Sequence, residues 1–271
     1  MKTTLIGLSN NIALNIEKIK VWSSSFKKYC PDGKIVLLAA NTTEEDIIAC
    51  NSLDIVYKQV RVEDTWYINH KRLSLIKDFL ETEEDGLFLV TDVFDVIFQG
   101  NPFSKLDYNR YDVFISEEGV TVNQEPWNSD NINKLFPEYY EMSKSQEVVN
   151  SGVIAGKRQA LIDLYSSMYN LCESSTKHHN IQDQAALIVK VAKKEIKNLK
   201  IFNLDDGWAM HCAVAGPTAF FESWGFKNSI KYGIPKMYSN VVQTACGNTY
   251  DIVHQFNRVP EWHEVLVKQY K

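Results

Sequence analysis

The sequence predicts an α/β fold with a central, mostly parallel sheet flanked by helices. Three observations support this prediction. Apolar strand-like segments alternate with helical segments through the first third of the chain, these strands are mostly continuous apolar runs, and turn residues separate the elements. Strands of this kind are typical of parallel sheets with both faces covered. The 271 residues are enough to bury a sizeable core.

The first third of the chain alternates strictly between the two kinds of element. The turn signal "CPDGK" precedes the second strand, and "TTEED" places acids in the first turn of the second helix. Strands are expected at residues 4–8, 34–40, 53–57 and 87–91, and helices at about 13–29, 42–50 and 70–81.

The later part is less regular, with loops rich in Gly, Pro and Asn. Strands are expected at 112–116, 152–155, 200–203 and 251–254, and helices at 158–173 and 182–196. Because no linker or repeat interrupts the chain, we predict a single domain over residues 1–271 whose two halves meet near residue 100.

Composition excludes several classes of partner. The net charge of −5 argues against a nucleic-acid partner. The sequence also has no basic amphipathic helix of the kind that attaches proteins to membranes. The N-terminal "MKTTLIGLSNN" has an apolar run too short for a signal peptide or a membrane span. Five scattered cysteines without a CxxC pair are typical of reduced thiols, so we expect a cytoplasmic protein.

The stretch "FLVTDVFDVIFQG" places two carboxylates where a buried strand ends, at Asp92 and Asp95. Ligands of open α/β sheets bind beyond the carboxyl ends of the strands. Two acids facing one point repel unless a cation lies between them, and oxygen ligands suit Mg²⁺ or Mn²⁺. The alternative is an acidic turn that water solvates or that caps a helix.

The stretch "DIVHQFNR" repeats this pattern near the C-terminus, where an apolar strand ends at His254. Taken alone, a histidine is usually a hydrogen-bonded surface or core residue. Together with Asp92 and Asp95, it would complete a mixed oxygen and nitrogen site, which favours Mn²⁺ over Mg²⁺.

The order of these motifs resembles that of the GT-A fold glycosyltransferases. A strand with Asp-x-x-Asp, "VVNSGVIAG", "NIQDQAAL" and a strand ending in His follow one another, with "FISEEG" and "EPWNSDN" between the first two. The pattern is similar to the glycosyltransferase domain of the multifunctional collagen lysyl hydroxylases. The resemblance implies that Asp92, Asp95 and His254 hold Mn²⁺ on the diphosphate of a UDP-sugar. The sequence departs from that family after His254, where Gln255 to Arg258 replace a Gly-Asn-Gly type segment.

The resemblance also assigns roles in sugar transfer. It implies that Asp183 faces the anomeric carbon of the donor sugar, with Gln184 beside it in the donor site; the alternative for Asp183 is a bond to its own helix start. Asn150, Ser151 and Gly152 are expected at the donor sugar, although a turn that needs glycine for positive φ explains the same residues.

The remaining candidate site residues are three basic residues that could bind phosphate, two residues at strand ends and one tryptophan. Lys71 and Arg72 open a helix, where a cation is mildly unfavourable unless an anion lies nearby, and Arg258 is near His254. Leu8 and Thr91, at two strand ends, are also assigned to the donor site. Trp127 matches the family position for acceptor binding, although most Trp residues are core anchors.

The sequence therefore predicts a metal-dependent glycosyltransferase that uses a nucleotide-diphosphate sugar as donor, with residues 1–100 binding the donor; the resemblance implies that this donor is a UDP-sugar. Residues 101–271 would bind the acceptor, a glycan or a protein, and the resemblance implies retention of configuration. Two alternatives stay open. One is a haloacid dehalogenase-like phosphohydrolase, in which the second Asp lies two positions after the first, whereas the interval between Asp92 and Asp95 is three. The other is a non-catalytic nucleotide-sugar-binding protein.

Overall fold

The computed structural model describes residues 1–63, 68–175, 182–215 and 232–270. An eight-stranded sheet forms its centre, with strand order β3-β2-β1-β4-β8-β6-β7 and with β9 also paired to β6. Strands β3, β2, β1 and β4 are parallel, whereas β8 runs antiparallel to β4 and to β6. The large sheet consists of β1 (Thr3–Ser9), β2 (Lys34–Ala40), β3 (Val56–Val60), β4 (Leu87–Thr91), β6 (Val113–Thr121), β7 (Glu147–Val149), β8 (Val153–Lys157) and β9 (Leu199–Phe202).

Two small sheets lie beside the large one. The first has the order β10-β13-β5, and the second is the β11-β12 hairpin. Their strands are β5 (Val96–Phe98), β10 (Ala209–His211), β11 (Lys236–Tyr238), β12 (Val241–Gln243) and β13 (Ile252–His254). The helices are α1 (Ile16–Tyr29), α2 (Glu44–Asn51), α3 (Ile68–Glu81), α4 (Pro126–Leu135), α5 (Tyr140–Ser143), α6 (Arg158–Ser174), α7 (Gln182–Ala192), α8 (Cys212–Ala215) and α10 (Pro260–Lys268).

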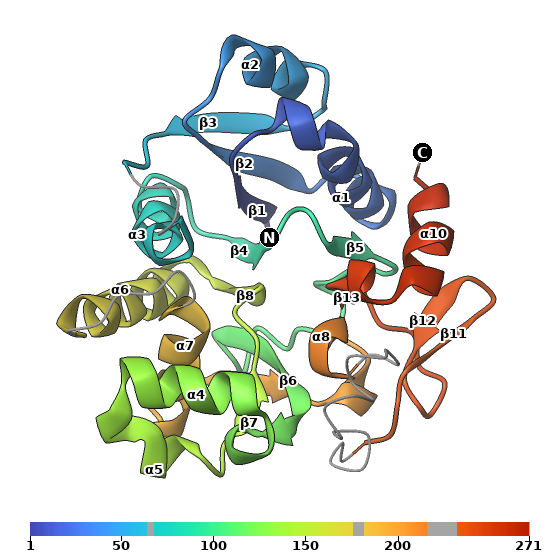
Figure 1. Cartoon of the computed structure of the whole chain (residues 1–271). Helices are drawn as coiled ribbons and strands as arrows, with labels where there is room; N and C mark the ends of the chain where they lie inside the picture. The colour runs from blue at the N-terminus through green and yellow to red at the C-terminus, as the bar shows by residue number, and fades with distance from the viewer. Residues whose placement is uncertain (64–67, 176–181, 216–231, 271) are drawn as a thin grey trace.

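Both faces of β1, β2 and β4 are buried, as their continuous apolar sequences predict, whereas β3 at the edge of the sheet has no buried residue. Within β1, Ile6 belongs to the core cluster that contains residues of α3, α6 and α7, while Leu5 belongs to the cluster that contains α1. The same alternation occurs in β4, where Phe88 and Leu89 face opposite sides. Figure 1 shows α3, α6 and α7 in succession on one side of the molecule, with α1 on the other.

The strand order creates a topological switch point between β1 and β4. The chain leaves β1 for β2 and β3 on one side, then crosses to place β4 on the other side of β1. Loops that leave the carboxyl ends of such strands in opposite directions open a crevice between them. The turn that carries Asp92 and Asp95 follows β4 and leads into β5, which pairs with the C-terminal β13.

Several expected elements differ from the structure in their limits. The third strand is Val56–Val60 and not 53–57, because Leu53 and Ile55 pack half-buried against the core before the pairing with β2 begins at Val56. The strand expected at 112–116 continues to Thr121. Helix α7 ends at Ala192 and not at 196. Among the described residues, no helix is long and apolar enough to span a bilayer.

Candidate active site

A cleft opens at the switch point that the strand order creates. Its walls are the carboxyl ends of β1 and β4, the turn after β4, and one face of the start of α3. The lining residues are Leu8, Ser9, Asn10, Ile68, Asn69, Arg72, Ile76 and residues 90–95. The cleft therefore includes both acids of the Asp-x-x-Asp turn.

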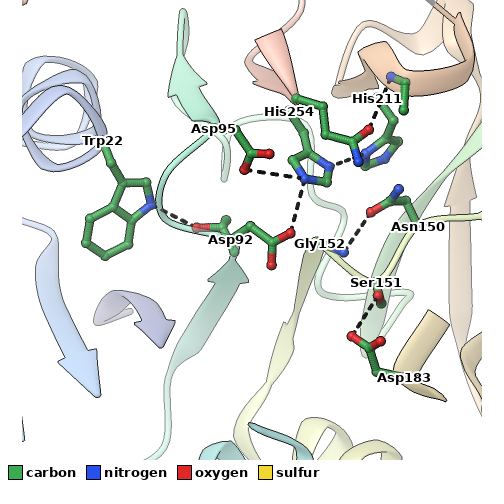
Figure 2. Close-up of polar contacts among 12 residues, drawn as sticks. Trp22, Asp92, Asp95, Asn150, Ser151, Gly152, Asp183, His211 and His254 are labelled. Carbon is green, nitrogen blue, oxygen red and sulfur yellow. Dashed lines mark hydrogen bonds and ion pairs between the residues drawn. The ribbon is translucent and has the colours of Figure 1, made fainter. Parts of the chain in front are cut away.

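The two acids and the C-terminal histidine converge beside this cleft. The Nε2 atom of His254 lies 3.2 Å from a carboxylate oxygen of Asp92 and 3.8 Å from one of Asp95. One donor atom from each residue lies within 4.8 Å of the other two. Figure 2 shows the imidazole pointing between the two carboxylates. Because β5 pairs antiparallel with β13, His254 lies opposite Val96, directly after Asp95.

This arrangement fits a divalent cation. An octahedral ion with bonds of about 2.1 Å holds neighbouring ligand atoms roughly 3 Å apart and opposite ones roughly 4 Å apart, and both His254 distances lie in this range. The Nε2 atom is buried and receives no hydrogen bond from the described residues. Two carboxylates and one imidazole suit Mn²⁺ better than Mg²⁺ by ligand type.

A buried arginine sets the electrostatics of the site. Arg72 is only 9% exposed, and its guanidinium donates to Asp92 at 2.6 Å and lies 3.1 Å from Asp183. Burial alone would raise the pKa of Asp92, but Arg72 and His254 outweigh it and hold that pKa well below its usual range. Asp92 is therefore ionised and available as a ligand.

Asp183 lies on the other side of the same guanidinium. The residue is 4% exposed, and its carboxylate accepts a hydrogen bond from the Ser151 hydroxyl at 3.0 Å. Burial raises the pKa of Asp183, although Arg72 and the Ser151 hydroxyl oppose that rise. Arg72 thus links Asp183 to Asp92. Figure 2 shows Asp183 below Ser151, across from His254.

The turn at Asn150 to Gly152 packs against the imidazole. A Cβ at Gly152 would lie 2.3 Å from Cε1 of His254 and 2.8 Å from its Nε2. Gly152 does not adopt a positive φ, so glycine is needed here for close approach and not for an unusual backbone conformation. The Asn150 amide shapes this turn, accepting from the Gly152 N–H at 2.7 Å and donating to Glu118 at 2.6 Å.

Two buried residues of the site were not identified from the sequence. His211 ends β10 and lies behind His254, with their Nδ1 atoms 2.9 Å apart. Burial lowers the pKa of His211 well below its usual value. Glu118 lies in "FISEEG", but nothing in that motif shows that the side chain is buried beneath Asn150. No local pattern indicates His211, because only the parallel pairing of β10 with β13 brings it to the site.

The other candidates occupy different positions around the cleft. Leu8 and Thr91 line it, and Thr91 accepts a hydrogen bond from Trp22 (Figure 2). Lys71 is exposed and is not among the lining residues. Arg258 is exposed and near enough to Asp95 to lower its pKa in part, although burial raises that pKa overall.

Trp127 and Gln184 lie on two neighbouring helices. Trp127, 40% exposed, is in the first turn of α4, where the Glu125 carboxylate accepts from its backbone N–H. Gln184 on α7 donates to Asn128 on α4 at 3.1 Å. Their roles in donor and acceptor binding stay predictions.

Comparisons with known proteins bear on this site. The profile of a family described as nucleotide-diphospho-sugar transferase matches residues 49–246. No curated protein matches the sequence. Among solved structures, a crystal structure of the galactosyltransferase LgtC in complex with donor and acceptor sugar analogs matches with a TM-score of 0.57 and 12% sequence identity, over 98% of this chain and 95% of that one. This likeness confirms the predicted α/β fold with a mostly parallel central sheet, of the GT-A type.

Proposed function

Because the chain belongs to the nucleotide-diphospho-sugar transferase family, we propose that it is a metal-dependent glycosyltransferase that moves a hexosyl group from a UDP-sugar to an acceptor hydroxyl. The observation that carries the proposal is the meeting of Asp92, Asp95 and His254 at the switch-point cleft. The motif order that resembles the glycosyltransferase domain of collagen lysyl hydroxylases supports the same assignment.

The chain's own residues would divide the work of binding and charge stabilisation. Asp92, Asp95 and His254 would hold Mn²⁺, which when bound supplies positive charge to the departing diphosphate. Arg72 fixes the Asp92 carboxylate in place through a 2.6 Å hydrogen bond and keeps it ionised. The strand ends at Leu8 and Thr91 would receive the donor nucleotide.

Asp183 is our candidate for the residue at the anomeric carbon. Its carboxylate is held by Ser151 and Arg72, so its orientation is fixed before the donor binds. A preorganised carboxylate stabilises positive charge that develops on the sugar in the transition state. We expect the reaction to retain the configuration of the sugar. We expect the acceptor to be a glycan or a protein and to pack against Trp127.

The experiment that tests the proposal is a donor screen. The protein is incubated with UDP- and GDP-sugars, with and without Mn²⁺, and the release of free nucleotide is measured. We expect Mn²⁺-dependent release of UDP. Metal-dependent release of inorganic phosphate from simple phosphate esters would instead establish the phosphohydrolase, and nucleotide-sugar binding without turnover on a broad acceptor panel would establish a binding protein.

Asp95→Asn is the companion variant, because it removes one charged ligand and preserves the shape of the side chain. It should reduce Mn²⁺-dependent turnover at least 100-fold, a loss of the size expected for transition-state electrostatics. Asp54→Asn is the matched control, since the Asp54 side chain is 95% exposed on the loop before β3. Turnover that survives in Asp95→Asn at the parent level contradicts the metal assignment.

A further inference from the structure

A second histidine lies directly behind the proposed metal ligand. His211 and His254 occupy matching positions on the parallel strands β10 and β13, and they are 0% and 1% exposed. Their rings are perpendicular, at 89°, and their Nδ1 atoms are 2.9 Å apart. The other nitrogen of His211, Nε2, lies 2.6 Å from the Ser116 hydroxyl oxygen. Figure 2 shows His211 on the side of His254 away from the acids.

The contacts restrict where the protons can lie. At 2.9 Å, the two Nδ1 atoms share one proton, so one of them donates and the other accepts. The Nε2 atom of His254 faces Asp92 and Asp95. If Nε2 is to offer a lone pair to a cation, the proton of His254 must be on Nδ1. His211 then accepts at Nδ1, and its own proton is on Nε2, directed at Ser116.

We propose that His211 is a positioning residue that holds His254 in the tautomer and orientation needed to bind the divalent cation. This inference rests on the proposed metal site. The opposite tautomer of His254 would aim an N–H at the two carboxylates and exclude the cation from the same space. A neutral ring nitrogen facing Nδ1 of His254 favours the productive form, as second-sphere acceptors do for other metal-bound imidazoles.

His211 makes a polar contact with Nδ1 of His254, on the side of the ring away from the acids. Gly152 closes the Cε1 edge, since even a methyl group at that position would lie 2.3 Å away. The ring is thus confined by van der Waals contact on one edge and oriented by a hydrogen bond on another. Removing the hydrogen bond while leaving the packing should preserve the fold and weaken metal binding.

The test compares substitutions that remove or retain the acceptor. His211→Leu removes both ring nitrogens, whereas His211→Asn keeps an acceptor oxygen close to the former Nδ1 position. Ser116→Ala removes the outer hydrogen bond with a smaller change in packing and serves as an independent variant. The matched control is Met210→Ala, which creates space at the preceding residue of β10, in the core cluster that contains Val253 of β13.

The readout is the Mn²⁺ dissociation constant, measured by electron paramagnetic resonance of the free ion with and without UDP, alongside the midpoint of thermal unfolding. We expect His211→Leu to bind Mn²⁺ at least about 10-fold more weakly than the parent. His211→Asn should recover most of this affinity, and Ser116→Ala should lose less than His211→Leu. Met210→Ala should unfold at a lower temperature but bind Mn²⁺ with the parent affinity.

The possible failures are distinguishable. A parent protein that binds no Mn²⁺, with or without UDP, overturns the metal site and the role of His211 together. If the parent binds Mn²⁺, and His211→Leu or Ser116→Ala binds it with the parent affinity, only the role of His211 is overturned. Equal losses in His211→Asn, His211→Leu and Met210→Ala would show that packing, and not the hydrogen bond, sets the affinity.

Discussion

At the scale of single residues, the site depends on buried charges that are partly compensated. Arg72 serves two carboxylates at once, Asp92 and Asp183, and also donates to the Ser151 carbonyl at 2.6 Å. Glu118 is different, because it is 1% exposed and its hydrogen-bond donor, Asn150, is a neutral amide. A buried carboxyl without a cation beside it retains its proton to higher pH.

We therefore predict that Glu118 makes stability depend on pH. Burial raises its pKa to about 7 from 4.5, with Glu125 adding to the rise and the Asn150 hydrogen bond opposing it. Between these values the folded state retains a proton that the unfolded state has released, so this group lowers stability as pH rises from 4.5 to 7. Glu118→Gln removes the titration. The free energy of unfolding of Glu118→Gln, relative to that of the parent, should therefore increase as the pH rises, by up to about 3 kcal/mol at pH 8.

Chemical denaturation at a series of pH values measures this difference. The exposed Glu138→Gln is the control and should show no such trend. A constant difference between Glu118→Gln and the parent from pH 4.5 to 8 would contradict the shifted pKa.

At the scale of elements, the site forms where two sheets approach each other. Gly152, directly before β8 of the large sheet, meets His254 at the end of β13, in the three-stranded sheet. The approach is possible only because residue 152 lacks a side chain. The same contact brings the Asn150 turn against His254, the proposed metal ligand.

Gly152→Ala should accordingly disturb the site more than its size suggests. Its Cβ would overlap Cε1 of His254, so either the ring or the turn must move; overpacking of this kind costs about 1–3 kcal/mol. We expect weaker Mn²⁺ binding together with a lower unfolding temperature. Gly86→Ala is the control, because its Cβ would also be tight, 2.9 Å from the Lys2 carbonyl oxygen, but at the opposite end of β4. Weakened Mn²⁺ binding in both variants would show that overpacking anywhere loosens the site.

The sequence predicted most elements because their local patterns are strong. Continuous apolar runs marked β1, β2 and β4, and helix limits near α1, α3 and α6 were close to those observed. The antiparallel direction of β8 was not predictable, because strand direction depends on topology and not on local composition. His211 was missed for the same reason: strand pairing between β10 and β13, and no local motif, places it beside His254.

At the scale of the whole molecule, the proposed ligands tie together parts of the chain that are distant in sequence. Asp92 and Asp95 come directly after β4 of the large sheet, whereas His254 ends β13 of the three-stranded sheet. A cation and nucleotide bound there should stabilise the folded protein, because ligands that bind only the native state add RT ln(1 + [L]/Kd) to its stability.

We predict that Mn²⁺ with UDP raises the thermal unfolding midpoint. At ligand concentrations 100-fold above Kd the gain is about 2.7 kcal/mol, which corresponds to a shift of several degrees for a protein of this size. Chelation with EDTA should reverse it, and Asp95→Asn should not show it. A full shift with UDP alone, insensitive to EDTA, would place the nucleotide in the cleft without a metal.

The pairing of β5 with β13 also sets an order of events during synthesis. The ribosome releases the two acids well before the strand that carries the imidazole, because a long stretch of sequence separates Asp95 from His254. A nascent chain can therefore begin to build the parallel strands while the proposed cation site still lacks its nitrogen ligand. Contacts of such long sequence separation form slowly, so loading with metal should mark the completion of folding.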